Sequence, residues 1–326
     1  MYLNQVFELS MAIDKDKFHK VLEKACDRSD DMVKRGEEYI DQVLARKGIT
    51  VLYRDSQYKK KVRVLLNLSM ALDDETNVDK LIRKIDKWIA GYFENKYRLD
   101  DFILSGVVLT TDIDVKTHDN VLAYLKVLQR IGKVRGFSPA AYDCFQEDES
   151  FCLDGNSNGI QFLIYDLGNL IQRQIRKTTT DTKKMRPIAA GTQGILRAEV
   201  RLVKPKAVRG YTEATEVSGQ IAELSKKCQD VFMDTFIHII PFGDFYKKDK
   251  AVEIVRKEVK DITLRRKMLQ LLTLIPEKKS LHLAQKAMNY RDIGKVMDML
   301  AKIKVSPVTI SKRQDEKYLK NIYAYI

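Results

Sequence analysis

Several segments in the first two thirds of the chain alternate apolar with polar residues, a pattern typical of β-strands with one buried face. The pattern predicts strands over residues 2–13, 49–54, 61–68, 106–115, 150–153, 159–165 and 196–202. Turn-rich residues separate 49–54 from 61–68, and 150–153 from 159–165. Each of these two pairs is therefore expected to form a hairpin.

Apolar residues at the spacing of an amphipathic helix occur between these strands. They predict two helices within residues 14–46, divided near 28–31, and further helices over 77–95, 120–131 and 166–177. Residues 178–192 hold a glycine, a proline and three basic residues, which is typical of a mobile loop. This alternation predicts an α+β fold, in which an antiparallel sheet carries helices on one face and leaves the other face free for a ligand.

The pattern changes after Lys204, where helical spacing continues and no strand pattern remains. Helices are expected over residues 212–240, 248–259, 261–275, 280–290 and 293–303. The sequence therefore predicts a sheet-based catalytic or DNA-binding domain in residues 1–205 and a helical C-terminal domain in residues 206–326.

The charge of the chain favours a polyanionic partner. Its 326 residues include 58 Lys and Arg against 45 Asp and Glu, a formal net charge of +13. Such an excess is typical of proteins that bind nucleic acid. Basic runs such as 265–267 and 312–313 also suit a surface that is only solvated, and the sequence leaves both interpretations open.

Cysteine and histidine usage is sparse. The four cysteines form no Cys-x-x-Cys pair and only four histidines are present, which leaves few ligands for a structural zinc ion. The N-terminus lacks a signal-peptide pattern, and no apolar run approaches the ~18 residues that a membrane span needs. We expect reduced thiols, no membrane contact and a cytoplasmic location.

Two kinds of candidate side chain lie at strand ends. Tyr165 closes the strand 159–165, although an aromatic residue there is more often a packing residue. Asp112 and Asp114 lie two residues apart near the end of the strand 106–115, on one face, and such a carboxylate pair suits a divalent metal.

A third candidate lies on the strand 196–202. Strict alternation places Arg197, Glu199 and Arg201 on one face of it. Taken alone, Glu199 is expected to pair with its own arginines on an exposed face. Three strands that carry such residues together favour a functional site.

The order of these segments resembles a known family. An Asp-bearing strand, a strand ending in a Tyr-Asp-x-x-x-Leu run and a Leu-Arg-x-Glu-Val-Arg-Leu strand are similar to segments of the rolling-circle replication initiators of filamentous phages, of related plasmid initiators and of transposon relaxase-like proteins. The likeness covers residues 100–205, and residues 300–310 and 318–322 loosely resemble the C-terminal end of the phage-type members.

The resemblance implies a mechanism for this chain. Tyr165 would attack a phosphodiester of origin DNA and remain joined to the 5′ phosphate. Asp112 and Glu199, completed by Asp114, would bind Mg²⁺ or Mn²⁺. Arg197 or Arg201 would stand beside the phosphate and lower the pKa of the phenol. Origin DNA, single-stranded at the nick, is the implied partner, with a host helicase and a second copy of the chain as further partners.

The chain also departs from the family pattern. Leu167 occupies the position of the usual lysine near the nucleophile, and Thr110 replaces an expected arginine. Lys183 or Lys184 from the basic loop, which with Arg186 is expected to bind DNA, is one substitute for the missing cation. Two hypotheses follow: a tyrosine-dependent enzyme that nicks and joins the origin of a mobile element, or a catalytically weak or inactive origin-binding protein derived from such enzymes.

Overall fold

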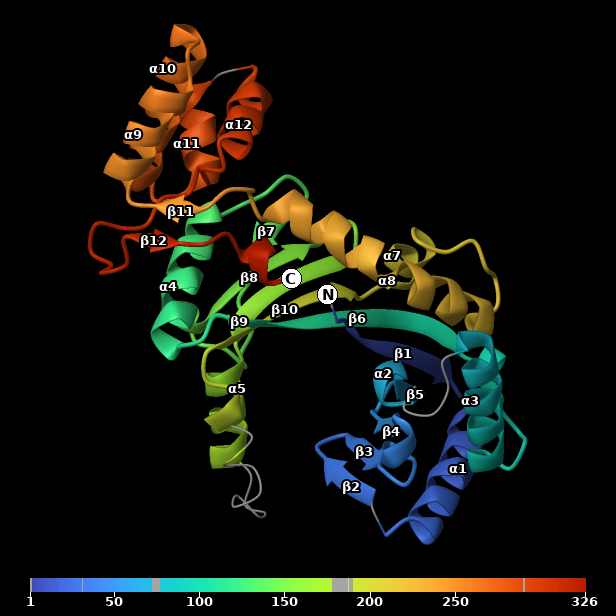
Figure 1. The fold of residues 1–326 in the computed structure, drawn as a ribbon. Coiled ribbons are helices and arrows are strands. Elements are labelled where there is room, and N and C mark those ends of the chain that lie inside the picture. The colour runs from blue at the N-terminus through green and yellow to red at the C-terminus, as the bar shows by residue number, and fades with distance from the viewer. Residues whose placement is uncertain (1, 31, 72–76, 178–186, 188–189, 290) are drawn as a thin grey trace. The chain divides into compact units, whose positions relative to one another are not determined.

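The computed structural model describes residues 2–30, 32–71, 77–177, 187, 190–289 and 291–326. Within them, ten strands form one sheet in the order β2-β3-β4-β5-β1-β6-β10-β9-β8-β7 (Figure 1). The strands are β1 (Asn4–Ala12), β2 (Met32–Arg35), β3 (Glu38–Asp41), β4 (Ile49–Asp55), β5 (Lys60–Asn67), β6 (Ile103–Asp114), β7 (Ser138–Pro139), β8 (Ser150–Gly155), β9 (Ile160–Asp166) and β10 (Ile195–Leu202). The predicted α+β class is confirmed.

The helices occupy most of the remaining chain. They are α1 (Lys15–Arg28), α2 (Leu68–Ala71), α3 (Val78–Tyr92), α4 (His118–Leu128), α5 (Leu167–Lys177), α7 (Pro205–Arg209), α8 (Val217–Ile239), α9 (Lys248–Glu258), α10 (Ile262–Lys278), α11 (Leu281–Met288) and α12 (Ile293–Lys302). Both predicted hairpins are confirmed, as β4–β5 and as β8–β9.

The chain folds as two compact units that interleave along the sequence. The first comprises Met1–Thr110, Asn158–Ile160 and Val200–Phe232, and the second comprises Thr111–Ser157, Gln161–Glu199 and Met233–Ile326. Strands β6 and β10 thus contribute residues to both units. The division at residue 205 that the composition suggested stays a prediction.

In the first unit, one face of β4 and β5 packs against helices. Val62 and Val64 are fully buried on β5. The ring of Phe18 on α1 meets the edge of Tyr53 on β4, with 6.2 Å between ring centroids. The hydroxyl of Tyr53 lies 2.9 Å from that of Tyr92 on α3. Helices α1 and α3 therefore cover the same face of these strands.

The opposite face of these strands carries ion pairs beside Leu52 and Leu65. Arg63 alternates with the buried valines of β5 and so points to the other side of the sheet. Its guanidinium pairs with Glu8 of β1 at 2.9 Å and with Glu38 of β3 at 3.0 Å. In the first unit these strands thus have one helix-covered face and one mixed face on which charged pairs lie beside leucines.

Residues 32–41 form the hairpin β2–β3, and the second helix predicted within residues 14–46 is wrong. Arg35 pairs with Glu38 across a two-residue turn, and Gly36 in that turn has a φ of +59°, which favours glycine. Strand β3 then pairs along β4. The backbone pairing of β3 with the β4–β5 hairpin stabilises the extended conformation. It outweighs the weak helical spacing of this short, charged segment.

The second unit contains the C-terminal helices, and α10 packs against α9, α11 and α12 (Figure 1). Helix α10 buries Met268, Leu271, Leu272 and Ile275. Beyond residue 204 no strand was predicted, yet Phe245–Tyr246 (β11) and Tyr318–Leu319 (β12) pair as short strands. A two-residue pairing between distant segments leaves no periodicity for the sequence to reveal.

Candidate functional site

The centre of the site is a hydrogen bond between neighbouring strands of the second unit. The hydroxyl of Tyr165, at the end of β9, donates to Oε1 of Glu199 on β10 over 2.5 Å. Both residues are buried, with 3% of Tyr165 and 6% of Glu199 exposed. The structure therefore brings together the predicted nucleophile and one predicted metal ligand, in direct contact with each other.

The ring of Tyr165 lies in an apolar cluster formed with Cys152, Leu163 and Leu167. The ring of Phe145 packs on it, with 4.5 Å between centroids. Leu167, at the position where related initiators are expected to have a lysine, is itself 3% exposed in this cluster. The residue that departs from the family pattern thus forms part of the apolar wall around the phenol.

Arg197 and Asp112 form a second pair across β10 and β6. The Nε and Nη2 atoms of Arg197 donate to the two carboxylate oxygens of Asp112 over 2.7 and 2.8 Å. This bidentate contact raises the pKa of Arg197, and the nearby Tyr165 and Glu199 act in the same direction. The Arg197 guanidinium is therefore near enough to Tyr165 for the two charges to interact, but two of its donors are bonded to Asp112.

Asp114 pairs with Lys116, a residue of neither pair. Its carboxylate accepts hydrogen bonds from the Lys116 backbone at 2.8 Å and from Lys116 Nζ at 2.7 Å. These bonds hold the pKa of Asp114 below its ordinary value. The carboxylate is well exposed to solvent.

The predicted set of Asp112, Asp114 and Glu199 therefore contacts three different partners. Within the described part of the chain, no three His, Cys, Asp or Glu side chains gather as a cluster that could bind a metal ion. These contacts do not fit one ion shared by all three carboxylates. Their role toward Mg²⁺ or Mn²⁺ stays a prediction.

Four further residues were predicted for the site. Arg201 lies on β10 and is half-buried. Lys183, Lys184 and Arg186 lie outside the described residues.

Sequence reasoning missed a second group beside Tyr165. The carboxylate of Asp166 is 1% exposed and lies 3.1 Å from Nδ1 of His118, the first residue of α4. One oxygen of Asp166 accepts from the backbone N–H of Asn169 at 3.0 Å and so caps α5. An Asp at the start of the predicted helix 166–177 was a signal for the cap, but nothing in the sequence connected it with His118.

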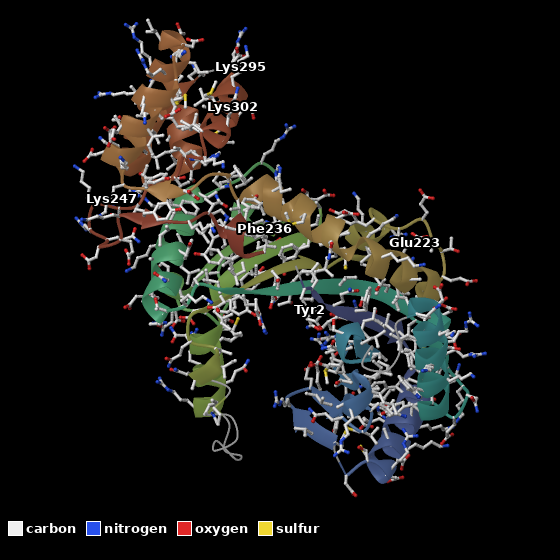
Figure 2. All side chains as sticks on the ribbon, in the orientation of Figure 1. Tyr2, Glu223, Phe236, Lys247, Lys295 and Lys302 are labelled. Carbon is white, nitrogen blue, oxygen red and sulfur yellow. The ribbon has the colours of Figure 1, made fainter. Side chains whose placement is uncertain are left out.

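Positive charge is concentrated on the C-terminal helices. Residues 247–304 contain sixteen Lys and Arg against seven Asp and Glu, an excess of nine out of the thirteen for the whole chain. Figure 2 labels Lys247, Lys295 and Lys302 among the side chains of this group. The exposed members are Lys250, Arg256, Lys257, Lys260, Arg266, Lys278, Lys279, Lys286, Arg291, Lys295, Lys302 and Lys304. We call residues 247–304 the basic helical segment.

Comparisons with known proteins add no relative: no family model matches the chain, and no curated protein matches it significantly. Among the helices that the structure describes, none has the length and apolar character needed to span a membrane.

Proposed function

We propose that this chain is a DNA-binding protein that acts at the replication origin of a mobile element. The observation that carries the proposal is the charge of the basic helical segment, which holds most of the chain's positive excess on a packed group of helices. Fixed, exposed lysines and arginines attract phosphates and release the counterions bound to them. The cytoplasm is the compartment that fits such a partner.

The surroundings of Tyr165 support binding without turnover. A phenol must reach a phosphorus atom to attack it, and this one is 3% exposed behind Phe145. Its hydroxyl proton is directed at Glu199. Leu167 places a hydrocarbon where the related enzymes are expected to have a cation, so this position offers nothing to stabilise a phenolate. These features favour the origin-binding alternative over the nicking enzyme.

Nicking and joining of origin DNA is the second candidate function, and one contact favours it. A nucleophile and its general base are expected within hydrogen-bonding distance, and Tyr165 and Glu199 meet that condition at 2.5 Å. In this candidate Glu199 takes the phenol proton and the phenolate oxygen forms a bond to phosphorus. The bond between phosphorus and the 3′ oxygen breaks, and that oxygen receives the proton from Glu199 and leaves as the 3′ hydroxyl. The ring of Phe145 must first move away from Tyr165. The resemblance also implies a host helicase and a second copy of the chain as partners.

Salt dependence of DNA binding tests the proposal. Affinity for a short duplex, measured by fluorescence anisotropy, is expected to fall steeply between about 50 and 200 mM salt through counterion release. Binding that is absent at low salt, or that does not change over this range, would contradict it.

A further inference from the structure

A cavity of about 260 Å³ lies within the second unit, beside the first turns of α4 and α5. It is lined by His118, Asp166, Gly168, Asn169, Gln172 and Gln193. One carboxylate, one imidazole and three side-chain amides therefore face a common space. All of these groups supply oxygen or nitrogen atoms of the kind that bind metal ions.

Asp166 is the unusual member of this lining. Its Oδ1 atom accepts a hydrogen bond from the backbone of Asn169, but its Oδ2 atom is buried and has no hydrogen-bond partner among the described residues. Nδ1 of His118 lies 3.1 Å from Oδ2 without forming a hydrogen bond of acceptable geometry. Leaving a buried carboxylate oxygen without a hydrogen bond is costly, so this atom requires a partner.

The separation of the two atoms fits a shared metal ion. Two ligand atoms about 2.1 Å from one ion, at an angle near a right angle, lie about 3.0 Å from each other. The observed distance between His118 Nδ1 and Asp166 Oδ2 is 3.1 Å. We propose that these two atoms bind a divalent first-row transition ion, with Mn²⁺ as the probe of choice.

The remaining coordination positions are supplied by amide oxygens and water. Gln172 and Gln193 line the cavity and carry carbonyl oxygens, which Mn²⁺ accepts together with carboxylate. The imidazole favours a transition ion over Mg²⁺. The site has two ionisable ligands and is distinct from the Asp112, Asp114 and Glu199 set. An ion there links the start of α4 to the start of α5 and stabilises the folded chain by binding to it.

A simple ion pair is the competing explanation. A protonated His118, 44% exposed, would neutralise Asp166 with no metal present. Asp166 also caps α5, so its loss could weaken the helix by itself. Asp166→Asn separates these effects, because Asn caps helices as well as Asp but is a much poorer metal ligand. His118→Gln removes the nitrogen from a half-exposed position, where folding is expected to survive.

The experiment is a Mn²⁺ titration of the full chain after chelator treatment, followed by the electron paramagnetic resonance signal of free Mn²⁺. One site is expected, with a rise in melting temperature when the ion is added. Asp166→Asn and His118→Gln should each weaken binding by at least about tenfold. Asp119→Asn removes a carboxylate one residue from His118, outside the cavity lining, and should change nothing.

Three results would overturn the proposal. The first is no Mn²⁺ binding by the parent chain. The second is binding that both cavity variants retain. The third is binding that Glu199→Gln or Asp112→Asn abolishes while the cavity variants keep it, which would place the ion at the carboxylate set instead. Because the titration does not involve DNA, failure of this proposal leaves the proposed function untouched.

Discussion

The hydroxyl of Tyr165 donates a 2.5 Å hydrogen bond to the carboxylate of Glu199, and both side chains are buried. A buried carboxylate depends on its donors, because an oxygen without one keeps its full desolvation penalty. Tyr165→Phe removes this donor and keeps the ring. It is therefore expected to lower the free energy of unfolding by about 1–3 kcal/mol, as measured by urea denaturation. A variant as stable as the parent would show that the bond contributes nothing.

The same variant decides whether Tyr165 performs chemistry. With supercoiled DNA that carries the element's own origin, and with Mn²⁺ present, the origin-binding account predicts no covalent protein–DNA adduct from the parent chain. The nicking candidate predicts an adduct that Tyr165→Phe abolishes and that Tyr246→Phe keeps. An adduct that depends on Tyr246 would assign the nucleophile to the other tyrosine.

Leu167 should matter for stability because it fills the cluster around Tyr165. Leu167→Ala is expected to cost about 2–5 kcal/mol of unfolding free energy. Leu283→Ala, at a leucine of α11 that is 48% exposed, is the matched control and should cost far less. Equal losses in the two variants would mean that the cluster is not packed as described. Leu167→Lys places an ammonium in the same apolar wall and is expected to destabilise the fold rather than restore catalysis.

The Arg197–Asp112 pair can be measured by a double-mutant cycle. Its members are 32% and 42% exposed, so solvent screens their attraction. The cycle of Arg197→Gln and Asp112→Asn is expected to give a coupling of about 0.2–1 kcal/mol that decreases with added salt. A coupling of several kcal/mol that salt does not change would point to a dry, buried pair instead.

Local patterns predicted the strands of the site but not their neighbours. The alternation in residues 196–202 was enough to place Glu199 and Arg197 on one face of a strand, and β10 confirms it. That β10 lies between β6 and β9 could not be read from periodicity, because strand order depends on tertiary pairing. The contacts of Glu199 with Tyr165 and of Arg197 with Asp112 follow from that order.

The errors have equally local causes. Residues 32–41 are short, charged strands whose pairing with β4 decides their conformation, so helical spacing misled the prediction. Leu167 was treated as a missing lysine, and only the packed structure shows it as a core residue. Asp166 was overlooked because its role depends on a contact with His118. His118 begins α4 and is distant from Asp166 in the sequence.

The central claim is that the chain binds DNA through the basic helical segment. The most direct test measures DNA binding after positive charges are removed from that segment. The test variant changes three exposed residues of α10, α11 and α12 to Gln: Arg266, Lys286 and Lys302. The control variant changes three exposed residues of α3 to Gln: Lys80, Arg83 and Lys87. Both variants lose three positive charges. The account predicts that the first variant binds a duplex more weakly and that its log–log salt slope shrinks by about 0.9 for each phosphate that is no longer neutralised, while the α3 variant binds like the parent. Equal weakening by the two variants, or none in the first, would contradict DNA binding through these helices.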